Sequence, residues 1–190
     1  DEQIGRLWAS LEELSVSEET RIGFCSDNGP ERDTPGSAGV FRERKRSLYE
    51  GGVRVPAFVV WKGYFKEGIR MEFPALTSDY LPTILDMLDL EYPGQRPIDG
   101  KSILKLLSGE ESKRDHAFGF IYREQLSWLG DRYKLISQNK GASYELYDLI
   151  EDPGEMSNLI DLEPHIALQM EEELTEWLKS VERSQAGQDY

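Results

Sequence analysis

The sequence is poor in the residues that build disulfides and soft-metal sites. Cys25 is the only cysteine among 190 residues, which excludes an intrachain disulfide and a zinc site made of several thiolates. The redox compartment therefore stays undetermined, and we interpret Cys25 as a small buried residue at a strand end. The only histidines are His116 and His165, and we expect structural or surface positions for both.

Long apolar runs are also lacking. No stretch approaches the ~20 apolar residues that a membrane-spanning helix needs, and a hydrophobic fraction of 38% is typical of a globular chain. The first residues, Asp1 to Gln3, lead directly into an amphipathic pattern, so we expect no signal peptide within this chain.

Positive charge is scarce. The chain has 22 lysines and arginines against 36 aspartates and glutamates, for a formal net charge of −14. Proteins bind nucleic acids and anionic membranes mainly by neutralising phosphates with Lys and Arg. The charge balance therefore disfavours both kinds of partner.

The first part of the chain has the pattern of an α/β layer. Apolar residues at helical spacing predict an amphipathic helix with one buried face over 3–15 and a helix with one apolar face over 77–90, and a shorter helix is predicted at 102–107. Buried strands are predicted at 21–26 and 55–61, and the loop between them is long enough to be functional or disordered. This order favours an α/β layer whose working loops lie at the strand ends.

The sequence pattern changes from helical to strand-like after a polar, charged stretch near residue 110. Short aromatic-rich segments at 117–122, 133–138 and 144–149 predict an antiparallel sheet, and Pro164 opens a final helix. We therefore expect the later part of a large α/β domain at 1–110, a small α+β domain at 111–183, and a tail at 184–190.

Three features of the first part could carry chemistry. Asp27 and Asn28 end a predicted strand and offer hard oxygen ligands for Ca²⁺ or Mg²⁺, although the same residues also suit a plain Asn-Gly turn. The basic run 41–46 could face an anion such as sulfate or phosphate, or could be a solvated charged turn. Glu50-Gly51-Gly52 indicates, by itself, only a tight turn.

Taken together, these motifs resemble the sulfatase family over most of the chain. The matching segments, in the family's order, are SDNGP at 26–30, Lys45, YEGGVRVP at 49–56, DGKS at 99–102, ELYDL at 145–149, and Asp152-Pro153, Glu155 and Asn158-Leu159. The resemblance implies an alkaline-phosphatase-like α/β sulfatase fold, of which this chain is the carboxy-terminal portion. It also implies a periplasmic or secreted location.

Site roles follow from the resemblance residue by residue. It implies that Asp27 and Asn28 are calcium ligands, and that Lys45 contacts the sulfate group and offsets its charge in the transition state. Structural roles are expected for Glu50 and Arg54, which would hold the loop against the sheet. No family role transfers to the arginines of the basic run.

The nucleophile of the family is expected outside this chain. Sulfatases use a formylglycine made from Cys or Ser in a Cys/Ser-x-Pro/Ala-x-Arg motif, and Cys25 lacks both the Pro/Ala and the Arg. We therefore expect a sulfate ester hydrolase acting on a sulfated small molecule or glycan, with this chain inactive alone.

Two alternatives remain open. One is a phosphodiesterase or phosphonate hydrolase of the same superfamily, and the other is a non-catalytic module that binds or assembles. Because a sheet without its other strands has open apolar edges, we also expect the chain to form homo-oligomers or to hide those edges by swapping or disorder.

Overall fold

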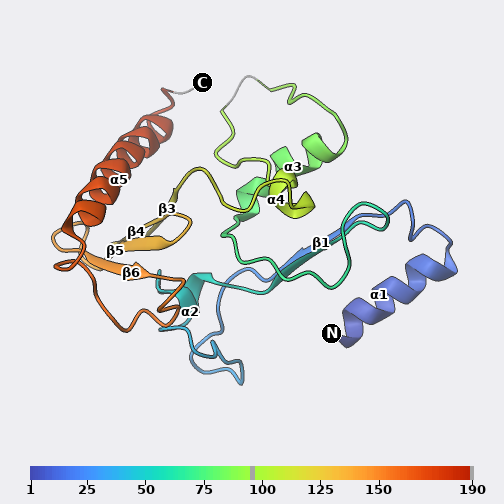
Figure 1. Ribbon diagram of the computed structural model, residues 1–190, viewed down its shortest axis with the longest axis horizontal. Helices are drawn as coiled ribbons and strands as arrows, with labels where there is room; N and C mark the ends of the chain where they lie inside the picture. Colours follow the sequence, from blue (N-terminus) through green and yellow to red (C-terminus); the bar gives the residue numbers. More distant parts are fainter. Residues whose placement is uncertain (95–96, 189–190) are drawn as a thin grey trace.

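A computed structural model describes residues 1–94 and 97–188 of the chain. The molecule is elongated, with α1 at one end and α5 at the other (Figure 1). In chain order its elements are α1 (Glu2–Glu13), β1 (Ile22–Cys25), α2 (Glu50–Val53), β2 (Ala57–Val60), the 3₁₀ helix η1 (Thr77–Asp79), α3 (Tyr80–Met87), α4 (Leu104–Ser108), β3 (Phe118–Tyr122), β4 (Gln125–Leu129), β5 (Tyr133–Ser137), β6 (Glu145–Asp148) and α5 (Pro164–Gln185). Within the described residues, no helix combines the length and apolar character needed to cross a bilayer.

Among the described residues, the first two strands pair only with each other. β1 and β2 are antiparallel, with Phe24 opposite Phe58, and the two rings stack with their centroids 5.2 Å apart. Both strands lie where the sequence predicts them, but the expectation that they are buried is wrong for this chain: the two phenylalanines are 38% and 37% exposed. Two strands cannot shield both of their faces without further layers.

The helices of the first part are likewise open on their apolar sides. α1 has no buried residue, and Leu7 and Leu14 are exposed, so the expected buried face is wrong here too. On α3 the predicted apolar face is also exposed at Leu81, Ile84 and Leu88. These surfaces have the composition of a protein interior but no covering layer among the described residues.

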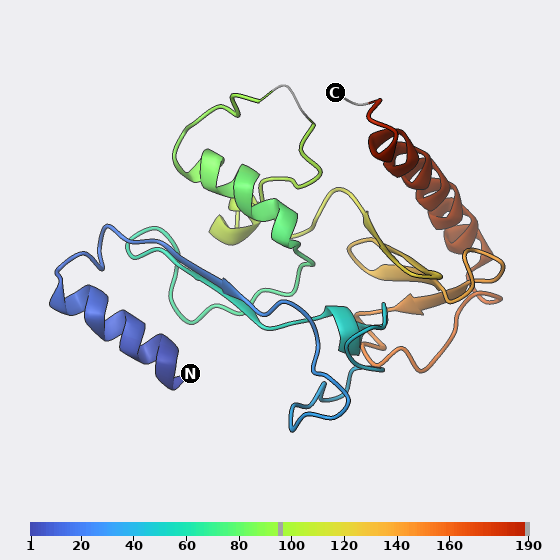
Figure 2. The same ribbon diagram turned by 180° about the vertical axis from the view of Figure 1, so that it is seen from behind.

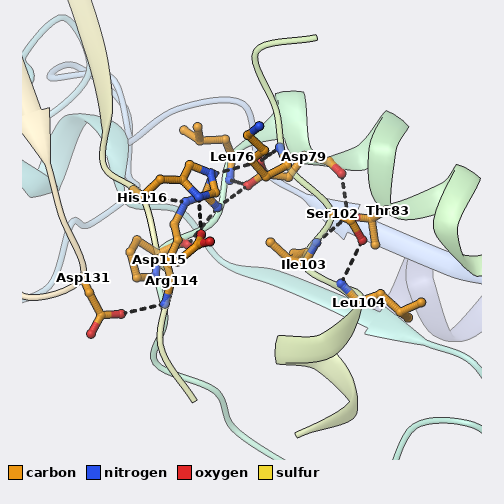
Figure 3. A network of polar contacts seen from close by, with 12 residues as sticks. Leu76, Asp79, Thr83, Ser102, Ile103, Leu104, Arg114, Asp115, His116 and Asp131 are labelled. Atoms are coloured by element: carbon orange, nitrogen blue, oxygen red, sulfur yellow. Dashed lines mark hydrogen bonds and ion pairs between the residues drawn. The ribbon is translucent and has the colours of Figure 1, made fainter. Parts of the chain in front are cut away.

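A buried ion pair joins the two parts of the chain (Figure 3). Arg114 donates to both carboxylate oxygens of Asp79, at 2.7 and 3.0 Å, and both side chains are 1% exposed. The same oxygens accept the backbone N–H groups of Leu76 and Lys101, at 2.8 and 2.9 Å. Arg114, in the charged stretch near the expected domain boundary, is therefore buried and paired.

The second part is a four-stranded antiparallel sheet in the order β3-β4-β5-β6, with α5 along one face (Figure 2). Three of these strands were predicted and β4 was missed. Its residues Leu126 to Leu129 are buried in succession, so the strand lacks the polar–apolar alternation of a half-exposed strand. α5 continues to Gln185, two residues into the predicted tail.

The two faces of this sheet pack against different partners. One face buries Leu126, Trp128, Leu135 and Leu146 against Ala167, Met170 and Leu174 of α5. The other face carries Ile136 and Tyr147, which pack against Leu48 and Tyr49 from the long loop of the first part. This second face is what holds the loop that contains Lys45.

Candidate functional site

The turn after β1 presents Asp27 and Asn28 at the protein surface. Asp27 is exposed and Asn28 is half-buried. Hydrogen bonds from the backbone amides of Asp27 and Asn28 lower the pKa of the Asp27 carboxyl, and the positive charge of Lys45 lowers it further. The carboxylate is therefore ionised at neutral pH, as a ligand of a hard cation must be.

Backbone contacts bring Lys45 to this turn. The N–H of Lys45 donates to the carbonyl of Pro30 at 3.1 Å, and the N–H of Gly29 donates to the carbonyl of Gly52 at 2.9 Å. The turn, the long loop and α2 thus meet at one place. The sequence-predicted residues Asp27, Asn28 and Lys45 lie together there, although 16 or more positions separate the lysine from the others in the chain.

Two glycines make this close approach possible. A Cβ at Gly29 would lie 1.9 Å from the carbonyl oxygen of Gly51, and a Cβ at Gly51 would lie 2.2 Å from that of Glu43. Both neighbours are backbone atoms, which cannot move aside like a flexible side chain. The Gly-Gly pair, read from sequence as a tight turn, lies in the single-turn helix α2, packed between the calcium-ligand candidates and the basic run.

The arginines of the basic run are occupied within the protein. Arg42 donates to the Tyr147 hydroxyl at 2.8 Å and to the Glu155 carbonyl at 3.1 Å. Arg44 donates to backbone carbonyls of the same loop, and Arg46 pairs with Glu31 at 2.9 Å. These three arginines therefore stabilise the loop through contacts within the protein, and they do not form an open anion-binding surface.

Lys45 differs from its neighbours. Its side chain is half-buried, and among the residues that the structure describes its Nζ makes no hydrogen bond or ion pair. An ammonium group with free donors beside an ionised carboxylate is suited to bind an anion that also contacts a cation at that carboxylate.

Beneath the loop lies a buried charge cluster that sequence reasoning largely missed. Lys134 Nζ lies 2.9 Å from Glu50 Oε1 and 2.9 Å from Glu155 Oε1, and all three side chains are at most 5% exposed. Arg54 Nη1 is 3.6 Å from the other oxygen of Glu50. Glu50 thus holds the loop against the sheet through Lys134, as expected, whereas Arg54 contacts Glu50 and no sheet residue among the described hydrogen bonds and ion pairs. The sequence signal for this cluster was Lys134, a charged residue between Tyr133 and Leu135 in a predicted strand.

The residues present fit part of a calcium site. Asp27 and Asn28 supply oxygen donors, which Ca²⁺ prefers, but a calcium ion takes roughly six to eight of them. The described part of the chain contains no group of three or more His, Cys, Asp or Glu side chains placed to hold a metal. Asp27 and Asn28 are therefore suitable calcium ligands, but they supply only part of the oxygen ligands that a calcium ion needs.

Comparison with known proteins gives one consistent result. Residues 36–184 match the family described as N-sulphoglucosamine sulphohydrolase, C-terminal. The chain is 37% identical over 127 residues to the steryl-sulfatase of Mus musculus, covering 63% of this chain and 20% of that protein. It is 30% identical over 216 residues to a sulfatase of Formosa agariphila, covering 94% of this chain and 38% of that protein.

Solved structures agree. The PsFucS1 sulfatase from Pseudoalteromonas sp. superposes with a TM-score of 0.78 at 25% identity, covering 94% of this chain and 40% of that one. A second, Ps i-CgsB, superposes with a TM-score of 0.84 at 21% identity, covering 92% of this chain and 40% of that one, and shows the likeness of fold. The chain spans two-fifths or less of the length of these relatives. It has the alkaline-phosphatase-like fold of its structural neighbours and belongs to the sulfatase family, in the carboxy-terminal portion of that family's proteins.

Proposed function

We propose that this chain is the carboxy-terminal portion of a sulfatase that hydrolyses sulfate esters, with Lys45 binding the sulfate group and Asp27 and Asn28 binding calcium. The observation that supports the proposal is that the Lys45 ammonium, which makes no hydrogen bond or ion pair with the described residues, lies near enough to the ionised carboxylate of Asp27 to lower its pKa. A sulfate ester carries negative charge on its terminal oxygens, and a donor aimed at them gains strength as charge builds up in the transition state.

Lys45 would act on the substrate as a fixed cation. Its backbone N–H is anchored to Pro30, so the side chain starts from a defined point. The Nζ would donate to a sulfate oxygen and offset the developing charge. Asp27 and Asn28 would hold a calcium ion, which when bound polarises the sulfate oxygens as a Lewis acid.

The nucleophile must come from elsewhere. Residues 25–29 read CSDNG, which lacks the Pro/Ala and the Arg of the formylglycine motif. We propose that a formylglycine and the remaining calcium ligands lie in a segment that precedes this chain in the intact protein, and that the chain alone does not turn over substrate. A periplasmic or secreted location is part of the same proposal.

The substrate we propose is a sulfated small molecule or glycan. One structural relative, 26% identical with a TM-score of 0.74, was solved with its substrate D-glucosamine-2-N,6-O-disulfate. Sugar sulfates and aryl sulfates present the same terminal group to Lys45, so a generic aryl sulfate reports on the proposed chemistry.

The test is hydrolysis of an aryl sulfate in the presence of calcium. The full-length product of the gene, with its formylglycine verified by mass spectrometry, is compared with this chain alone. Activity is expected only in the full-length protein, and Lys45→Ala should lower kcat on the order of 100-fold to 1,000-fold, as does the loss of one donor to a developing oxyanion.

Lys66→Ala is the matched control, because Lys66 is an exposed lysine with no assigned role, and it should leave kcat unchanged. Full activity of Lys45→Ala would refute the role of the lysine. A verified full-length protein that cleaves a phosphodiester instead would favour the phosphodiesterase alternative. A folded protein that cleaves neither ester would favour a non-catalytic module.

A further inference from the structure

We propose that Gln125 and Glu155, together with Lys134, are positioning residues for catalysis: they hold the loop that carries Lys45 in register with the turn that carries Asp27 and Asn28. We call residues 41–49 the lysine loop. The inference rests on the proposed role of Lys45, and it assigns to the small sheet the task of aiming that residue.

Gln125 holds the lysine loop from one side. This residue begins β4 and lies on the sheet face opposite α5. Its Oε1 accepts the backbone N–H of Leu48 at 2.9 Å, and its Nε2 donates to the backbone carbonyl of Arg46 at 3.0 Å. One carboxamide therefore binds the residues on both sides of Ser47, which lies two positions after Lys45. A side chain that uses both its donor and its acceptor on a loop backbone fixes the loop's position and orientation.

Glu155 holds the other end of the loop. Its Oε2 accepts the backbone N–H of Glu50 at 2.6 Å, which is the first amide of α2. Its backbone carbonyl accepts from Arg42 at 3.1 Å, at the start of the lysine loop. Glu155 thus touches the chain on both sides of Lys45, and its backbone adopts a left-handed conformation, φ 54°, to do so.

Lys134 holds Glu155 and Glu50 together. Two carboxylates at a buried site repel each other unless a cation lies between them, and the Lys134 ammonium is within 2.9 Å of both. Arg54, which is exposed, adds a second positive charge near Glu50. Two negative and two positive side chains then balance, which explains how a lysine is accommodated in the middle of a buried strand.

The last link runs through α2 to the metal-ligand candidates. Gly51 donates its N–H to the carbonyl of Arg42 at 2.8 Å, and Gly52 accepts from the N–H of Gly29 at 2.9 Å. α2 therefore touches the lysine loop through one glycine and the Asp27–Asn28 turn through the next. A shift of α2 would move the ammonium of Lys45 relative to Asp27, and small displacements of a reacting group reduce rates strongly.

The experiment is a set of double-mutant cycles in the full-length, matured protein, with aryl sulfate hydrolysis as the assay. Glu155→Ala and Gln125→Ala are each combined with Lys45→Ala. If the two residues act by aiming Lys45, each lowers kcat more than it raises KM. Lys45→Ala should then lose most of its effect in their background, from the order of 100-fold to about 10-fold or less.

Asp148→Ala is the matched control. Asp148 is also a buried carboxylate of the small domain; it accepts the backbone N–H of Ile150 at 3.1 Å and pairs with Arg132, but it does not touch the lysine loop. Asp148→Ala should lower the stability of the fold without coupling energetically to Lys45. Lys45→Ala should therefore lower kcat by the same factor in the Asp148→Ala protein as in the wild-type protein. Glu155→Gln retains an oxygen that can accept the Glu50 N–H, and it should recover most of the kcat lost in Glu155→Ala.

The outcomes separate this inference from the proposed function. If Lys45→Ala has no effect in the otherwise unchanged protein, the proposed function fails. If Lys45→Ala lowers kcat as expected but its effect is undiminished beside Glu155→Ala and Gln125→Ala, only the positioning role is refuted. Should Glu155→Ala not fold, Gln125→Ala decides alone, because Gln125 is not fully buried and contributes two neutral hydrogen bonds.

Discussion

The ion pair between Asp79 and Arg114 gives the sharpest prediction about stability. The two carboxylate oxygens of Asp79 accept four N–H groups, two from Arg114 and one each from the backbones of Leu76 and Lys101. Asp79→Asn keeps one oxygen and turns the other position into an NH₂ group. One backbone N–H then lacks an acceptor, which costs about 1–3 kcal/mol, and Arg114 loses its buried counter-charge, which costs about 3–5 kcal/mol.

The expected loss for Asp79→Asn is therefore about 4–8 kcal/mol, against about 3–5 kcal/mol for Arg114→Met, which leaves the two backbone N–H groups satisfied. Urea unfolding of the intact protein, followed by tryptophan fluorescence, measures both losses. Asp89→Asn makes the same chemical change at an exposed residue whose left-handed φ of 52° suits Asn, and it should alter stability by less than about 0.5 kcal/mol. An Asp79→Asn loss equal to or smaller than that of Arg114→Met would refute this reasoning.

Two further predictions concern pH and association. Burial alone would raise the pKa of Asp79, but the hydrogen bonds and charge of Arg114 with the two backbone amides outweigh it and hold the pKa below the ordinary value of 3.8. Ionisation of Asp79 therefore stabilises the folded state fully above pH 3.8, and this stabilisation is lost as pH falls through the folded-state pKa. The difference in unfolding free energy between the wild-type protein and Asp79→Asn should therefore narrow in acid. A difference that stays constant down to pH 2 would contradict this prediction. Because Phe24, Phe58 and Leu81 are exposed, the isolated chain should self-associate in light scattering, and a monodisperse monomer at about 100 μM would count against this.

The sequence predicted the elements better than their surroundings. The periodicity of α1 and α3 was read correctly, but their apolar faces are exposed, because periodicity indicates which face prefers burial and not what covers it. β4 was missed for the opposite reason. Both of its faces are covered, so the alternation that marks a half-exposed strand is absent from residues 125–129.

At the candidate site, too, the sequence predicted some features and missed others. Asp27, Asn28 and Lys45 were predicted from motifs, and the structure brings them together through backbone hydrogen bonds. The support beneath them was not predictable in the same way. Gln125 and Lys134 are ordinary residues in the sequence. Their proposed roles depend on contacts with Leu48 in the lysine loop and with Glu50 in α2, 77 or more positions away. Spacing rules describe helices and strands, but not which strand face meets which distant loop.

Under the proposed function, the two faces of the small sheet have different tasks. The face toward α5 is packed with apolar side chains, and it needs only shape and volume to be satisfied. The opposite face buries Ser127 and Lys134 among apolar residues. Burying such polar groups costs more folding free energy than burying apolar side chains in their place. Directional contacts such as those of Lys134 and Gln125 fix the register of the loop in a way that apolar packing does not. Substitutions on the α5 face should therefore change how much protein is folded, whereas substitutions on the loop face should change how well the folded protein aims Lys45.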